Sequence, residues 1–349
     1  MNLAENSRQM AENMASRKSQ LEELIYQKLL VDNSNVDDLK NYLRTMGIEA
    51  TRTEVMDILN ELKQRINFSV SFSTHPTYKV AIPELLTDVD LPISVDGERN
   101  YIDIVLDSDM HIAEFSKEVL EGFDALGNYC VKIGASLCVN LGDLFQGFGS
   151  VPPTYENSKK NYKLVHEAIS LIPTFDGVYQ AIMGGNHSRN IANYGYNPIK
   201  MLTDARSDFI YLGFNHATLS FHKNSSLLGK IDLHHPDSYG CRVRQTRTKF
   251  DENNIMQYLH DVYVRQKRKR DDSFIDIFGH THRSVFNMIN SYCHLPAFFH
   301  GRGACRLRLY FEDEDEISYA VFTQLHFTGK ELIETGETVY QKVKSMEQK

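Results

Sequence analysis

Five short apolar runs in this chain of 349 residues each lead into a cluster of metal-binding side chains, and three of the clusters also contain glycine. The runs and the clusters that follow them are YIDIVL with Asp109 and His111, SLCVNL with Gly142 and Asp143, VYQAIM with Gly185, Asn186 and His187, KIDL with His234 and His235, and FIDIF with Gly279, His280 and His282. Amphipathic helical patterns at about 116–133 and 155–171 lie between the runs, so strands and helices alternate. This alternation predicts an α/β domain, in which the carboxyl ends of neighbouring strands bring such clusters to one crevice.

The residue types in the clusters suit a pair of divalent metal ions. Two such ions at roughly 3.5–4 Å repel each other, so a carboxylate must lie between them, and Asp143 is the natural bridge. Carboxylate, imidazole and amide oxygen together favour manganese, iron, zinc or cobalt, whereas all-oxygen magnesium or calcium sites do not need histidines. The neighbouring glycines let the backbone turn sharply where a ligand must point inward.

In this order, the five clusters resemble the motifs of the calcineurin-like metallophosphoesterase superfamily. Those motifs are D-x-H, G-D-x-x-D, G-N-H-(E/D), a histidine after a strand, and G-H-x-H. The resemblance covers about 100–285 of the chain. It implies a β-sandwich flanked by helices, which hydrolyses phosphate esters with two divalent ions. Mn²⁺ is the first expectation for these ions, with iron, zinc, cobalt or nickel as alternatives.

The resemblance also implies a role for each motif residue. Asp109, His111 and His282 would hold the first ion, Asn186, His234 and His280 the second, and Asp143 both, while His187 would donate a proton to the leaving oxygen and Arg189 and Arg283 would bind phosphate oxygens. For the histidine after the fourth strand, His234 is preferred to His235 because it ends the KIDL run and precedes x-Pro.

Two positions depart from the family's motifs. Gln146 replaces the second Asp of G-D-x-x-D, and Ser188 replaces the acidic residue after G-N-H. Neither position is a direct metal ligand in the family's pattern, so metal binding is expected to survive. Gly184 stands where the superfamily's protein serine/threonine phosphatases carry an arginine, which disfavours a protein phosphatase.

Outside the motifs, the sequence divides into parts of different character. The predicted divisions are a flexible tail at 1–18, a small α+β domain at 19–82, a linker at 83–99 with two prolines, the metallophosphoesterase domain at 100–329, and a charged, helical tail at 330–349. Three helical patterns, two of them with N-caps at Asn35 and Thr51, precede an alternating hairpin pattern, which predicts a winged-helix-like module. Across residues 1–82, 10 Lys+Arg against 11 Asp+Glu leave DNA binding and a protein or dimer contact equally open.

These observations together predict a two-metal phosphoesterase that cleaves phosphodiesters, with a nuclease acting on DNA or RNA as the first hypothesis. The alternatives are a phosphomonoesterase or small-nucleotide phosphodiesterase and, outside the enzymes, a DNA-binding regulator with an inactive phosphoesterase fold; a homodimer is a further option. The formal charge of -8 excludes a global basic field for nucleic acid but allows a local patch. Five cysteines without a C-x-x-C pair predict a cytoplasmic protein, and the lack of a long apolar run predicts no membrane span.

Overall fold

The computed structural model describes residues 3–72, 75–95, 99–148, 154–236, 273–282, 284–287, 291–311 and 316–341. The chain divides into two compact units. The first comprises Met1–Glu84, Phe148–Leu164 and Asn190–Pro198, and the second comprises Leu85–Gly147, Val165–Arg189 and Ile199–Lys349.

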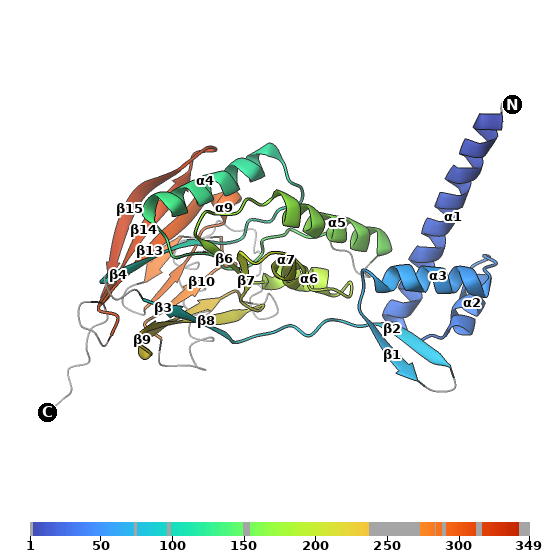
Figure 1. Cartoon of the computed structure of the whole chain (residues 1–349), viewed down its shortest axis with the longest axis horizontal. Coiled ribbons are helices and arrows are strands. Elements are labelled where there is room, and N and C mark those ends of the chain that lie inside the picture. The colour runs from blue at the N-terminus through green and yellow to red at the C-terminus, as the bar shows by residue number, and fades with distance from the viewer. Residues whose placement is uncertain are drawn as a thin grey trace, which may run out of the picture. The chain divides into compact units, whose positions relative to one another are not determined.

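The first unit contains the three helices and the hairpin that the sequence predicts. They are α1 (Leu3–Val31), α2 (Val36–Thr45), α3 (Arg52–Lys63), β1 (Phe68–Phe72) and β2 (Pro76–Val80), with β1 and β2 antiparallel. Both predicted caps form: the Asn35 side chain accepts hydrogen bonds from the first turn of α2, and Thr51 and Glu54 form a reciprocal capping box on α3. These caps fix where each helix begins (Figure 1).

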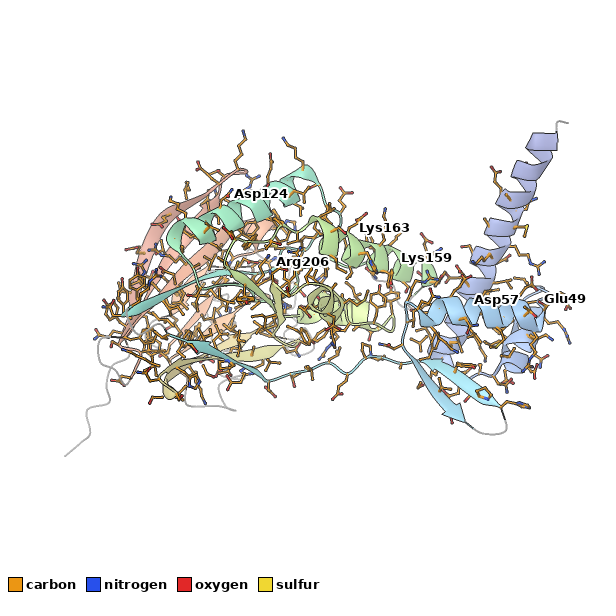
Figure 2. All side chains as sticks on the ribbon, in the orientation of Figure 1. Glu49, Asp57, Asp124, Lys159, Lys163 and Arg206 are labelled. Carbon is orange, nitrogen blue, oxygen red and sulfur yellow. The ribbon has the colours of Figure 1, made fainter. Side chains whose placement is uncertain are left out.

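The described part of the segment predicted as a tail is helical, since α1 begins at Leu3. The segment 3–18 has no strong apolar stripe, but it is rich in Ala, Glu, Met, Gln, Lys and Arg, which are good helix formers, so it extends the helix that Leu21 and Ile25 anchor in the core. Arg17 adds a link by donating to the backbone oxygen of Glu49 at 2.8 Å (Figure 2 labels Glu49).

The first unit is larger than the predicted domain at 19–82. The backbone N–H of Asn67 donates to the oxygen of Gly195 at 2.9 Å, and the hydroxyl of Tyr26 donates to the oxygen of Tyr194 at 3.3 Å. The backbone N–H of Tyr155 donates to a carboxylate oxygen of Glu23 at 3.1 Å. Two segments from later in the sequence therefore complete the packing of the N-terminal helices.

The second unit contains two sheets. The seven-stranded sheet has the order β15-β14-β13-β4-β5-β6-β7, with β4 (Tyr101–Asp107), β5 (Leu137–Asn140), β6 (Tyr179–Ile182), β7 (Phe209–Tyr211), β13 (Gly303–Tyr310), β14 (Tyr319–Phe327) and β15 (Leu332–Tyr340). The six-stranded sheet has the order β11-β12-β10-β9-β8-β3, with β3 (Val89–Ser94), β8 (His216–Lys223), β9 (Ser226–His234), β10 (Ile275–Phe278), β11 (Val285–Asn287) and β12 (Tyr292–His294). The remaining helices are α4 (Lys117–Ile133), α5 (Tyr155–Leu171), α6 (Gly185–Ala192), α7 (Pro198–Ala205) and α9 (Phe298–Gly301).

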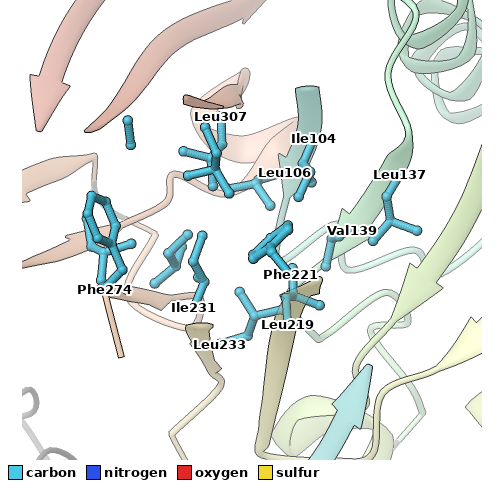
Figure 3. Close-up of a cluster of buried hydrophobic side chains, with 14 of the residues drawn as sticks. Ile104, Leu106, Leu137, Val139, Leu219, Phe221, Ile231, Leu233, Phe274 and Leu307 are labelled. Carbon is cyan, nitrogen blue, oxygen red and sulfur yellow. The ribbon is translucent and has the colours of Figure 1, made fainter. Parts of the chain in front are cut away.

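The two sheets share one apolar core, which confirms the predicted mixed α/β class. Alternate residues of β4, such as Ile104 and Leu106, pack in the same buried cluster as Leu219 and Phe221 of β8 (Figure 3). The five predicted runs became β4, β5, β6, β9 and β10, and β4, β5 and β6 run parallel. Their carboxyl ends therefore lie at the same edge of the sheet. In the part of the chain that is described, no helix has the length and apolarity needed to cross a bilayer.

The predicted linker and C-terminal tail both contain strands. In 83–99, Val89, Leu91 and Ile93 alternate toward the core and β3 pairs with β8; Pro92 is tolerated because β3 is an edge strand without a second partner. In the tail, β15 pairs antiparallel with β14 and forms one edge of the seven-stranded sheet. Its charged residues, such as Glu334, are exposed, which is common in edge strands because charge discourages pairing with another chain. In the sequence, the same charged residues look like those of a solvent-exposed helix.

Candidate metal centre

Backbone hydrogen bonds continue beyond the strand ends and hold the motif loops against one another. The N–H of Asp109 donates to the oxygen of Gly142 at 3.0 Å, and the N–H of Asp143 donates to the oxygen of Gly184 at 3.0 Å. These bonds connect the loop after β4 to the loop after β5, and the loop after β5 to the loop after β6. The N–H of His280 donates to a carboxylate oxygen of Asp109 at 2.8 Å, which joins the loop after β10 to the same edge.

The first group of ligand atoms comes from Asp109, His111 and His282, the three residues predicted to share an ion. The Nε2 atoms of His111 and His282 lie 3.0 Å apart, and Nε2 of His282 lies 3.2 Å from Oδ1 of Asp109. One carboxylate oxygen and two imidazole nitrogens therefore converge, with all three ligand atoms within 4.8 Å of one another.

A second group of ligand atoms lies around Asp143 and Asn186. Nδ1 of His280 lies 2.8 Å from Oδ1 of Asn186, and Nε2 of His235 lies 3.1 Å from the same oxygen. Nε2 of His235 also lies 3.1 Å from Oδ2 of Asp143. Asp143 is shared between the two groups, since its carboxylate also lies within 4.8 Å of the ligand atoms of His111 and His187. This is the position that a bridging carboxylate requires.

The structure brings His235 rather than His234 to this group, which corrects the sequence preference. Nε2 of His234 lies 2.7 Å from Oδ1 of Asp276, on the other face of the six-stranded sheet. The reason is strand alternation: Ile231 and Leu233 point into the core, so His234 points away and His235 returns to the core side. The same alternation, counted along KIDLHH, would have identified His235 from the sequence.

His187 lies beside the ligands in the first turn of α6, where its backbone N–H donates to Oδ1 of Asp143 at 2.8 Å. Its ring Nδ1 lies 2.6 Å from the backbone oxygen of Gln146, and its ring centroid lies 4.6 Å from that of His111. Because a carbonyl oxygen can only accept, His187 Nδ1 carries a proton and Nε2 is the atom left for chemistry. Gln146 therefore contributes through its backbone, which the sequence could not reveal.

The protonation of the buried groups differs along the site. Burial alone lowers the pKa of His235, but the charge of Asp143 outweighs it and raises the pKa to about 9, so a cation bound there would have to displace a proton. Burial lowers the pKa of His111 to about 4, and burial together with the charge of His235 lowers the pKa of His280 to about 4. Burial alone raises the pKa of Asp109, but the hydrogen bond from His282 and the charge of His235 outweigh it and hold the pKa well below its usual range. Ionised carboxylates and neutral imidazoles are the forms that bind cations.

An unsatisfied buried atom supports the fit of a cation to this donor set. Oδ1 of Asp109 is fully buried and accepts no hydrogen bond of good geometry from the described residues, although Nε2 of His282 lies 3.2 Å away. A buried carboxylate oxygen in this state is costly unless a cation or a proton satisfies it. Five of the motif residues also adopt positive φ, namely Asp109 (54°), His111 (51°), Asp143 (53°), His280 (74°) and His282 (55°). Such strain in non-glycine residues collects at functional sites.

Gly185 has a steric role that can be tested. Its φ is +78°, and an added Cβ would lie 2.7 Å from the backbone nitrogen of Asp143. Gly177 is a matched control, since its φ is +71° and nothing lies within 4 Å of an added Cβ. Gly177→Ala is expected to cost about 1–2 kcal/mol of unfolding free energy through backbone strain alone. Gly185→Ala is expected to cost roughly 1–3 kcal/mol more because Asp143 must move. Urea unfolding of both variants measures the difference, and equal costs would show that the contact is unimportant.

The structure describes only one of the two arginines that were predicted to bind phosphate. Arg189 is half-buried on α6, the helix that also carries Asn186 and His187, while Arg283 lies outside the described residues. One further residue near the site was not assigned from the motifs: His300 of α9 is exposed, and its ring centroid lies 6.1 Å from that of His111. A hydrogen bond of 2.9 Å from the N–H of Phe298 to the oxygen of Ser108 holds α9 beside the first motif.

Comparison with known proteins gives matches only at the level of structure. No protein-family model matches the chain, and no curated protein has a matching sequence. A predicted phosphoesterase from Streptococcus pneumoniae TIGR4 aligns with 69% of this chain and 98% of its own length, at 14% identity and a TM-score of 0.33. The calcineurin-like phosphoesterase YfkN from Bacillus subtilis aligns with 69% of this chain and 90% of its own length, at 11% identity and a TM-score of 0.32. GAP50, the anchor in the inner membrane complex of Plasmodium, aligns with 71% of this chain and 91% of its own length, at 10% identity and a TM-score of 0.44.

These structural neighbours include phosphoesterases, but the identities and TM-scores are too low to assign a family. Functional inference therefore depends on the chain's own side chains: two groups of metal-ligating atoms that share Asp143, with His187 beside them.

Proposed function

We propose that this chain is a calcineurin-like metallophosphoesterase that hydrolyses phosphodiester bonds with two divalent metal ions. The observation that carries the proposal is the convergence of seven side chains from five loops into two ligand groups that share one carboxylate. In the second group, His235 takes the place predicted for His234.

The two ions would be held by different parts of the site. Asp109, His111 and His282 would hold one ion, and Asn186, His235 and His280 the other, with Asp143 between them. This mixture of carboxylate, amide and imidazole donors favours Mn²⁺, Fe, Zn²⁺, Co²⁺ or Ni²⁺ over Mg²⁺ or Ca²⁺. When bound, such ions lower the pKa of water toward about 7 and withdraw charge from a phosphoryl oxygen.

His187 would supply the proton for the leaving oxygen. Its Nδ1 is occupied by the carbonyl of Gln146, and this bond fixes the ring and makes Nε2 the atom that carries the transferable proton. The hydrogen bond from the backbone N–H of His187 to Asp143 holds His187 at a fixed place relative to the ligands. Arg189, on the same helix, is proposed to contact phosphate oxygens.

The proposed substrate is nucleic acid. Support for this comes from the order of elements in the first unit, three helices followed by a hairpin, which matches a winged-helix-like module that would recruit DNA or RNA to the phosphoesterase.

A substrate panel tests the proposal on the full chain. Metal-free protein is reloaded with Mn²⁺ and given single-stranded DNA, duplex DNA, RNA, bis-p-nitrophenyl phosphate and p-nitrophenyl phosphate. Cleavage of a nucleic acid and of the diester, stopped by a chelator, is the expected result. Hydrolysis of the monoester alone would replace the proposal with a phosphomonoesterase. Tight DNA binding without any hydrolysis would indicate a regulator with an inactive fold.

The assignment of His235 has its own test. His235→Ala is expected to lower hydrolysis of the diester by a factor of about 10²–10³, because it removes one ligand and the partner of Asp143. His326→Ala, at an exposed position of β14, serves as the control and should retain the wild-type rate. Equal rates for the two variants would remove His235 from the site.

A further inference from the structure

A second cluster of histidine and aspartate side chains lies on the outer face of the six-stranded sheet. It consists of His216 from β8 and Asp232 and His234 from β9, and their ligand atoms all lie within 4.8 Å of one another. Ala217 and Leu233 point into the core, so these three residues point to the opposite face. None of the three is used by the proposed phosphoesterase site.

The cluster is closely packed. Nε2 of His216 lies 3.5 Å from Oδ1 of Asp232, and the ring centroids of His216 and His234 are 4.8 Å apart. The exposed fraction of the side chain is 13% for His216, 4% for Asp232 and 6% for His234. Burying an ionised carboxylate between two imidazoles is costly unless each polar atom has a partner.

The ring nitrogens of His216 face two carboxylates, Asp88 and Asp232, but without well-aligned hydrogen bonds. Both of its ring nitrogens are buried, and neither makes a hydrogen bond with suitable geometry to a residue that the structure describes, although Oδ1 of Asp88 lies 3.0 Å from Nδ1. Asp232 cannot donate, and its Oδ1 already accepts from the hydroxyl of Thr218 at 2.6 Å. Nε2 of His216 lies 3.5 Å from Oδ1 of Asp232, which is longer than a normal hydrogen bond, and an ion between the two atoms would satisfy both.

Each histidine also has a carboxylate at one ring nitrogen, which leaves the other for a ligand bond. Asp88 lies beside Nδ1 of His216, and Asp276 lies 2.7 Å from Nε2 of His234. A carboxylate behind a histidine is the arrangement that orients imidazole ligands in metal sites and increases their basicity.

We propose that His216, Asp232 and His234 form a third cation site, of a chemistry suited to Zn²⁺. Two imidazole nitrogens and one carboxylate oxygen are a common ligand set for this ion, with a water molecule completing the coordination. The ion would link β8 to β9 on the face of the sheet opposite to the one on which His235 lies. This site is separate from the phosphoesterase centre and does not depend on the function proposed for that centre.

Zinc stoichiometry of the full chain tests this proposal. Chelator-stripped protein is dialysed against Zn²⁺ alone, and zinc per chain is measured by plasma mass spectrometry. His216→Ala and Asp232→Asn are each expected to bind one ion fewer than the wild type. Asp232→Asn keeps the side-chain size and can still accept from Thr218, so it guards against a variant that simply fails to fold. His222→Ala, on the same strand but outside the cluster, is the control and should bind as the wild type does.

A double variant separates this site from the phosphoesterase centre. Asp143→Ala alone is expected to keep the ion at His216, and Asp143→Ala with Asp232→Asn is expected to lose it. If Asp232→Asn and His216→Ala, both folded by circular dichroism, bind as much zinc as the wild type, the third site does not exist, whatever the fate of the other two ions.

Discussion

Replacing Asp143 by alanine is expected to release both ions of the proposed phosphoesterase centre and to abolish hydrolysis. Asp143 is 1% exposed, and its two carboxylate oxygens face different partners: Oδ1 accepts from the N–H of His187, and Oδ2 faces Nε2 of His235. Without this charge, two cations at close distance would repel each other with nothing between them. The loss of metal and the loss of rate should therefore occur together.

The measurement pairs metal content with the rate of diester hydrolysis. Asp124→Ala is the matched control, since Asp124 is an exposed carboxylate on α4 (labelled in Figure 2) and should keep both ions and the full rate. Because Asp143→Ala is expected to stay folded, circular dichroism should match that of the control. A variant that retains both ions would show that Asp143 does not bridge them.

Replacing His187 by alanine is expected to keep both ions but to lower turnover by a factor of about 10²–10⁴, the usual contribution of a general acid. The ring makes its hydrogen bond to the carbonyl of Gln146, and the contact with Asp143 is made by the backbone N–H, which the substitution keeps. The loss should also depend on the leaving group. A p-nitrophenolate leaves without a proton, so bis-p-nitrophenyl phosphate should lose less rate than a nucleic acid, whose alkoxide requires one.

Single-turnover rates on both substrates, measured with metal content, check this expectation. His166→Ala, an exposed position on α5, is the control. The ligand atom of His187 also lies within 4.8 Å of those of His111 and Asp143, so a ligand role is the competing interpretation. Loss of an ion in His187→Ala would favour that interpretation, and an equal loss of rate on both substrates would argue against proton donation.

The strands and the loops that carry the motifs could be predicted because their signals are local. A short apolar run specifies a buried strand wherever it lies in the fold, and the runs 101–106 and 274–278 correspond to β4 and β10 as expected. The helix caps at Asn35 and Thr51 are equally local, since each acts within three residues.

The features that the sequence did not reveal depend on tertiary partners. β15 is charged along most of its length, and it is a strand only because β14 offers it an edge. The first unit includes Gly195 and Tyr155, whose hydrogen bonds to the N-terminal helices and hairpin have no signature in the local sequence. The choice between His234 and His235 is a local matter, because strand alternation along KIDLHH places His235 on the side of Ile231 and Leu233, whereas a following x-Pro says nothing about the face.

The central claim is that one pocket holds two ions through Asp143, and anomalous diffraction tests it most directly. Crystals of the full chain loaded with Mn²⁺ would be measured at the manganese absorption edge. The expected result is a pair of anomalous peaks, one beside Asp109, His111 and His282 and one beside Asn186, His235 and His280, with the carboxylate of Asp143 touching both. A single peak, or a pair placed away from Asp143, would contradict the account.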